Sequence, residues 1–140
     1  MMKLLNKDAG LALLRASFGL LMLFGHGASK MAAFGKLAGS FPDPFGVGSE
    51  FSLLLALSAE VGASLLVTLG LLTRWSLLPL LFTMLVAFFG IHGADPFAVK
   101  EMALLYAIVY SSLLIAGPGR YSLDHLIGRR HSLYGRLVPA

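Results

Sequence analysis

The chain alternates between long apolar segments and short polar interruptions. Predominantly apolar residues fill 11–28, 51–72, 75–91 and 102–116. A membrane-spanning helix needs about 20 such residues, with a working range of roughly 17–25. Helices of a soluble bundle would carry a continuous polar stripe, whereas the polar residues here are isolated points. The pattern therefore predicts an all-α fold, an integral membrane four-helix bundle that forms a single domain over residues 1–140.

Start and stop signals set the predicted boundaries. Asp95 is a plausible N-cap for the last span and Pro96 a plausible first helical residue, and the glycines of "GPG" end that span. The tail is too short and too basic to cross a membrane, so we expect a short basic interfacial helix on an anionic leaflet. The expected boundaries are spans at about 9–30, 51–72, 75–92 and 97–117, followed by an interfacial tail at 118–140.

Composition and charge narrow the class of protein further. Residues are 57% hydrophobic and only 13% charged, where a soluble domain carries roughly a quarter charged residues. No cysteine is present, which excludes disulfides, thiolate-bound metals and covalently attached c-type haem within this chain. The net charge of +4 is better explained by contact with lipid than with nucleic acid, so no nucleic-acid partner is expected.

Basic residues predict the orientation in the membrane. They concentrate in loops that face the cytoplasm. Seven lie at the N-terminus, in the second loop and in the tail, and three lie in the first and third loops. Both termini are therefore expected to be cytoplasmic. The seven are Lys3, Lys7, Arg74, Arg120, Arg129, Arg130 and Arg136, and the three are Lys30, Lys36 and Lys100.

The first predicted span carries three basic side chains. A helical residue turns by about 100°, so Arg15, His26 and Lys30 fall on one face. Intramembrane charges cost about 2.5–3.5 kcal/mol each on insertion scales, so they usually face the bundle and pair. Arg15 would need a long reach towards an acid in the bundle, or it would extend to the cytoplasmic head groups.

Acidic partners lie on the second and fourth spans. Glu60 is placed roughly 13 Å below the outer surface, and Glu101 and His92 lie near the outer boundary. The outer half of the bundle is thus expected to hold a polar ligand pocket, in which Glu60 and His26 are the best catalytic candidates. Its predicted residues are Arg15, His26, Lys30, Glu60, His92 and Glu101.

The same residues allow other interpretations. They would also serve as structural ion pairs that hold the helices in register, or as a proton path. Lys30 at a helix end commonly extends to the surface, and Glu101 in a first turn favours the positive end of the helix dipole. Haem b between His26 and His92 is not favoured, because the two need not face each other, and no metal cluster is expected.

Several motifs resemble the DoxX family. They are "RASFGLLMLFGHGASK" from Arg15, "EVGASLLVTLGLLTR" from Glu60, Glu101 on the last span and "GPGRYSLD" from Gly117. The resemblance implies a multi-pass four-helix protein of the bacterial inner membrane. Relatives in that family include the DoxD-type subunit of thiosulfate:quinone oxidoreductase, and other members are linked to oxidative or thiol stress. The family pattern falls on Arg15, Gly19, His26, Gly27, Lys30, Glu60, Gly70, Arg74, Glu101, Gly117, Gly119 and Asp124.

Together these observations predict a membrane subunit that binds a quinone or another small redox molecule. It would work with an oxidoreductase partner in stress responses or sulfur metabolism. His26 or Lys30 would hydrogen-bond a quinone carbonyl, and Glu60 would accept or deliver the proton. Two alternatives stay open: a non-enzymatic membrane scaffold or chaperone with structural ion pairs, and a small-molecule transporter. The sequence leaves open whether the protein is an enzyme and whether it forms a homo-oligomer.

Overall fold

The fold is taken from a computed structural model, which describes residues 6–130. Within that range, four helices are long and apolar enough to cross a membrane, which confirms the predicted all-α membrane bundle. They cover Lys7–Ala32, Ser49–Leu69, Thr73–Ile91 and Phe97–Ala116. In chain order the elements are α1 (Lys7–Met22), η2 (Leu23–Gly27), α2 (Ala28–Ala32), α3 (Phe34–Leu37), α4 (Ser49–Leu57), η3 (Ser58–Ala63), α5 (Ser64–Leu69), α6 (Thr73–Leu85), η4 (Val86–Ile91), α7 (Phe97–Ala116) and α8 (Leu123–Arg130).

Three of the spanning helices contain a π turn, named η2, η3 and η4. In each turn an amide donates to the carbonyl five residues earlier: Ala28 to Leu23 in the first, Ser64 to Ala59 in the second. In the third, near the end of its span, the His92 amide donates to the Ala87 carbonyl. Such wide turns are rare and occur frequently at functional sites. Two of them contain residues that the sequence marked as candidates, His26 and Glu60.

The bundle buries a narrow core and leaves a broad apolar surface. α6 packs against α7, and α1 packs against both α5 and α7. Apolar side chains also point outwards, among them Ile115 (82% exposed) and Phe89 (71% exposed). Apolar side chains on this scale suit contact with lipid rather than with water. The fully or almost fully buried large residues of the core are Met22, Leu53, Val67, Leu77, Leu80, Tyr110 and Leu113.

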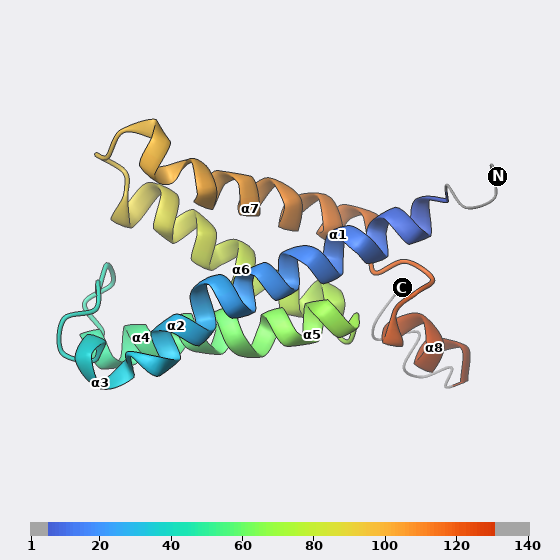
Figure 1. Cartoon of the computed structure of the whole chain (residues 1–140), viewed down its shortest axis with the longest axis horizontal. Helices are drawn as coiled ribbons and strands as arrows, with labels where there is room; N and C mark the ends of the chain where they lie inside the picture. The colour runs from blue at the N-terminus through green and yellow to red at the C-terminus, as the bar shows by residue number, and fades with distance from the viewer. Residues whose placement is uncertain (1–5, 131–140) are drawn as a thin grey trace.

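The two ends of the bundle differ (Figure 1). One end, called the terminal end, holds the start of α1, the turn at 70–72, the segment 117–122 and α8. The opposite end, called the loop end, holds α3, residues 38–48 and residues 92–96. Which end faces the cytoplasm stays a prediction from the distribution of charge. Lys3, Arg136 and the tail beyond residue 130 lie outside the described residues.

The long connection at the loop end folds back on the bundle. Asp43 accepts hydrogen bonds from the Val47 and Gly48 amides at 3.0 and 2.7 Å and from the Ser52 hydroxyl at 2.8 Å. These bonds close the turn that leads into α4. Phe45 then stacks on Phe82 of α6, with ring centroids 5.9 Å apart. The connection is therefore tied to the second and third spans.

Acid is expected to loosen this connection. The hydrogen bond from the Gly48 amide is the main cause that lowers the pKa of the Asp43 carboxyl below its ordinary value. A lowered carboxyl pKa contributes stability above the unfolded pKa of about 3.9, and this contribution disappears as the pH falls through the folded pKa. The protection of the Val47 and Gly48 amides against hydrogen exchange, relative to the intrinsic rate at each pH, should fall below about pH 4. Asp43→Asn should exchange fast and lack this step, and equal rates in both proteins would contradict the expectation.

Candidate functional site

A buried ion pair joins the first two spans. Lys30 Nζ lies 2.7 Å from Glu60 Oε1 and 2.6 Å from Oε2, so one ammonium contacts both carboxylate oxygens. Only 4% of the Glu60 side chain is exposed, against 24% for Lys30. The carboxylate is thus shielded inside the bundle, while the ammonium remains reachable at its edge.

Close packing of the η2 backbone against the η3 backbone fixes the geometry of the Lys30–Glu60 pair. A Cβ atom on Gly27 would lie 2.8 Å from the Glu60 carbonyl oxygen and 2.8 Å from Val61 Cγ2. Only a glycine allows η2 and η3 to approach this closely. The Ser64 hydroxyl donates to the Glu60 and Val61 carbonyls and so adds side-chain hydrogen bonds to this turn. The geometry of the pair therefore depends on Gly27 and on the π turns.

Gly27→Ala is expected to destabilise the protein by about 1–3 kcal/mol, the usual cost of overpacking. Replacing glycine by alanine inside a helix contributes up to about 1 kcal/mol of stability, but the new methyl group would meet backbone atoms that cannot move alone. Gly25 is the matched control, because nothing lies within 4 Å of its Cβ position. Thermal unfolding in detergent should rank Gly25→Ala at or above wild type and Gly27→Ala below it; the reverse order would refute the packing argument.

Aromatic rings of α7 cover the next turn of this site. The His26 ring lies edge-on to Tyr106, with centroids 5.7 Å apart and an interplanar angle of 89°. Tyr106 also contacts Phe18 and Tyr110. His26 lies within electrostatic range of both Lys30 and Glu60. The structure thus brings three of the six predicted site residues together and adds Tyr106.

Sequence reasoning missed Tyr106 and Tyr110. Both are almost fully buried, with relative exposures of 4% and 0%, and the Tyr110 hydroxyl donates to the Phe18 carbonyl at 3.4 Å. Their spacing of four residues places both on one face of α7. Because the hydroxyl of a buried tyrosine usually requires a hydrogen-bond partner, two tyrosines on one face of a membrane-spanning helix could have indicated that this face points into the bundle.

Arg15 is not part of this site. The sequence predicted a reach towards Glu60 or an extension to the head groups, and the structure corrects both. Arg15 is only 3% exposed and its Nη2 donates to the Tyr121 carbonyl at 2.8 Å. The carboxylate of Asp124 also lies within electrostatic range. The polar groups that stabilise Arg15 come from the segment after the last span, which folds back under the bundle at the terminal end.

Asp124 organises the same end. Its Oδ1 and Oδ2 accept hydrogen bonds from the Leu72 and Thr73 amides at 2.7 and 2.8 Å, and its own amide donates to the Gly70 carbonyl. Gly70 and Leu72 both have positive φ, at 70° and 49°. Leucine rarely adopts this conformation, so it persists where the surroundings fix it. Asp124 thereby caps α6 and holds the turn between the second and third spans against Arg15.

The other two predicted site residues lie apart from Lys30 and Glu60. His92 Nδ1 is 2.7 Å from Asp95 Oδ2 in the connection at the loop end, and both side chains are partly exposed. Asp95 was predicted to cap the last span, but Pro96 occupies the N-cap position and Asp95 pairs with His92 instead. Glu101 is exposed near the start of α7. The fold therefore does not bring all six predicted residues into a single pocket.

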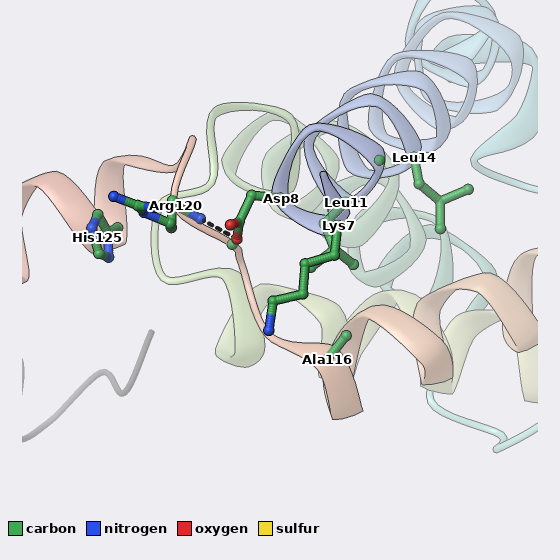
Figure 2. Close-up of a pocket in the computed structure, with 9 residues that line it drawn as sticks. Lys7, Asp8, Leu11, Leu14, Ala116, Arg120 and His125 are labelled. Atoms are coloured by element: carbon green, nitrogen blue, oxygen red, sulfur yellow. Dashed lines mark hydrogen bonds between the residues drawn. The ribbon is translucent and has the colours of Figure 1, made fainter. Parts of the chain in front are cut away.

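Two cavities on the described part of the chain lie away from the Lys30–Glu60 pair. One, of about 610 Å³, lies at the terminal end between α1, the end of α7 and α8 (Figure 2). The other, of about 580 Å³, is a shallow apolar groove where η3 and α5 meet α6. Neither is lined by Lys30 or Glu60. Between residues 6 and 130, no group of three His, Cys, Asp or Glu side chains is placed to hold a metal ion.

Comparison with known proteins identifies the family to which the chain belongs. The sequence model of the DoxX family matches residues 10–93, more than half of the 140 residues. The chain belongs to the DoxX family. It is also 30% identical over 99 residues to a Haemophilus influenzae protein described as uncharacterised, a match that covers 67% of this chain and 66% of that relative. No solved structure matches.

The family match spans the structural features that this DoxX protein uses to join its first two spans. Residues 10–93 include Arg15, Lys30, Glu60 and the turn at Gly70. Tyr106 and Asp124 lie beyond the matched region but contact residues inside it. As a DoxX-family chain with four apolar helices, the protein is a multi-pass membrane protein, and lipid is its immediate environment.

Proposed function

We propose that this DoxX-family protein binds a quinone or a similar small redox carrier at Lys30 and Glu60, in the bacterial inner membrane. An oxidoreductase partner would exchange electrons with the bound carrier. The observation that carries the proposal is a buried carboxylate whose ammonium partner is still partly exposed at the edge of the bundle.

The hydrogen-bonding capacity of Lys30 supports a ligand that accepts a hydrogen bond. An ammonium group carries three N–H donors. Two atoms of Glu60 accept from Lys30, so one donor remains for a ligand carbonyl. His26 offers a second donor or acceptor one turn away, and its ring is held against Tyr106. A planar carbonyl compound with an apolar body suits this combination of donors and aromatic walls.

Glu60 and Lys30 also supply the proton chemistry that such a carrier requires. Reduction of a quinone to a quinol takes up two electrons and two protons. The protons would pass through the Lys30–Glu60 pair: the Lys30 ammonium would donate a proton to the ligand, and the Glu60 carboxylate would accept a proton from water and pass it to Lys30. The electrons would come from the partner, of a class that transfers electrons to or from quinones, because this chain has no cysteine to relay them.

A second function, a non-enzymatic membrane scaffold, is favoured by one observation. Gly27 brings the two helix backbones into direct contact beside the ion pair, and the cavities of about 610 and 580 Å³ lie elsewhere. In that case Lys30 and Glu60 would fix the register of the first two spans and bind no ligand. The redox function predicts that substitution of Lys30 or Glu60 releases a bound small molecule. The scaffold function predicts that no small molecule is bound at the pair.

Native mass spectrometry distinguishes the redox function from the scaffold function. The protein is purified from membranes in mild detergent, and bound small molecules are extracted. Wild type would be compared with Lys30→Met, Glu60→Gln and His26→Ala. Lys36→Met and Glu50→Gln are matched controls, because both residues are exposed outside the pair. A quinone that is present in wild type and the controls, and lost from the pair variants while circular dichroism is unchanged, supports the redox function. No quinone in any sample refutes it.

A further inference from the structure

The cavity at the terminal end lies where α1 begins and α7 ends. Figure 2 shows Lys7 on one side of Asp8, with Arg120 and His125 on the other side. Its volume of about 610 Å³ is in the range of sites that bind small molecules or head groups. The lining residues are Lys7, Asp8, Gly10, Leu11, Leu14, Ala116, Gly119, Arg120 and His125.

The charges around the cavity favour an anionic group. Lys7 and Arg120 contribute two cations and His125 contributes a ring N–H donor, against the single carboxylate of Asp8. Asp8 is already engaged, because its Oδ1 accepts a hydrogen bond from the Arg120 amide at 3.1 Å. A carboxylate has further lone pairs, which would accept hydrogen bonds from hydroxyl groups. The cavity thus suits a phosphodiester that also carries hydroxyl donors.

The position of the cavity along the spans favours a lipid as the source of that group. Lys7 is the first residue of the first span and Ala116 the last residue of the fourth. The polar residues therefore lie at the level of the head groups, and Leu11 and Leu14 extend one and two turns further into the apolar layer. Ile115, which precedes Ala116 in the chain, is 82% exposed and offers additional apolar surface at this end of α7. A free phosphate would use the polar rim and leave these walls without a partner.

We propose that this cavity binds one molecule of an anionic glycerophospholipid with a hydroxylated head group, with the chemistry of phosphatidylglycerol. The phosphodiester contacts Lys7 and Arg120, the glycerol hydroxyls donate to Asp8, and the acyl chains run along Leu11 and Leu14. This site is separate from the Lys30–Glu60 pair and does not depend on the proposed redox function. It also differs from a diffuse attraction of the basic tail to the membrane surface, because it requires residues of α1.

The test is a titration of the full chain in detergent with dioleoyl-phosphatidylglycerol, with bound lipid counted by native mass spectrometry. A basic residue at a membrane surface contributes about fivefold to binding of anionic lipid. Lys7→Ala and Arg120→Ala should each weaken binding of the first lipid about fivefold, and the double variant about 25-fold if the two act independently. Both side chains are exposed, so the variants should keep the wild-type circular dichroism spectrum; Lys7→Ala alone is sufficient if Arg120→Ala alters its loop.

The matched control is Arg129→Ala, which removes an exposed cation of α8 at the same end but outside the cavity. Less than a twofold change in this variant supports the site, and a loss equal to that of Arg120→Ala overturns it in favour of diffuse attraction. Dioleoyl-phosphatidylcholine binding as tightly as the anionic lipid also overturns the proposal. Glycerol 3-phosphate that binds as tightly as the lipid would show that a free phosphate ester, not a lipid, is the ligand.

Discussion

Lys30→Met is expected to destabilise the folded protein by about 3 kcal/mol or more. The substitution leaves the Glu60 carboxyl, whose side chain is only 4% exposed, without the ammonium that contacts both of its oxygens. The carboxylate then has to stay buried without a partner or to take up a proton, and either outcome costs free energy. A neutral hydrogen bond between membrane helices contributes only about 0.6 kcal/mol, so the charge and not the hydrogen bond dominates. Unfolding from mixed micelles, followed by circular dichroism, measures the loss.

The double variant Lys30→Met/Glu60→Met provides the internal control. Replacing both members of a buried pair by apolar groups of similar size is often neutral, so the double variant should be more stable than Lys30→Met alone. Lys36→Met, at an exposed position of α3, should change the free energy of unfolding by less than about 0.5 kcal/mol. A Lys30→Met protein as stable as wild type would show that the pair contributes nothing to the fold.

Asp124→Ala is the second large effect, with an expected loss of about 2–4 kcal/mol. The change removes the acceptor of the Leu72 and Thr73 amides, and Thr73 is fully buried. It also removes the carboxylate that lies within electrostatic range of Arg15 and the support for the left-handed conformation of Leu72. Because these groups lie at one point of the terminal end, the free-energy costs should add to more than that of a single helix cap.

Asp124→Asn should fall between wild type and Asp124→Ala, since an amide keeps one acceptor oxygen but loses the charge. Asp95→Ala is the comparison for an exposed aspartate, because Asp95 forms a partly exposed pair with His92, and pairs of that kind contribute about 0–1 kcal/mol. Thermal midpoints in detergent give the order. If Asp124→Ala and Asp95→Ala shift the midpoint equally, the terminal end is not organised by Asp124.

The four spans could be predicted because the bilayer restricts the possible structures. In lipid every backbone polar group must be satisfied within the segment, so a stretch of apolar residues of the right length has little choice but to form a helix. The contact between Lys30 and Glu60 follows the same logic, because a buried carboxylate on one span requires a cation on another. Length, apolarity and the requirement to neutralise charge are all readable from residue types alone.

Arg15 and the π turns could not be predicted from the same information. The partner of Arg15 is a backbone carbonyl 106 residues away, in a segment whose path depends on how the finished bundle packs. The shared face expected for Arg15, His26 and Lys30 assumed about 100° per residue throughout. The π turn at Leu23–Gly27 breaks that count, and no residue type specifies such a turn. Position along the helix also matters: Arg15 contacts Tyr121 and lies beside Gly70 at the terminal end, whereas Lys30 contacts Glu60 and His26 contacts Tyr106 nearer the loop end.

The three wide turns have a consequence for how the length of this chain can vary. Each holds one residue more than the α-helical turn that would replace it. At present Gly19 lies against Thr68 and Lys30 contacts Glu60. Loss of one residue within η2 would leave an ordinary helix that keeps both contacts. Loss of one residue elsewhere in the same helix would rotate everything beyond it by about 100°. Insertions and deletions within the spans should therefore concentrate at these turns during evolution.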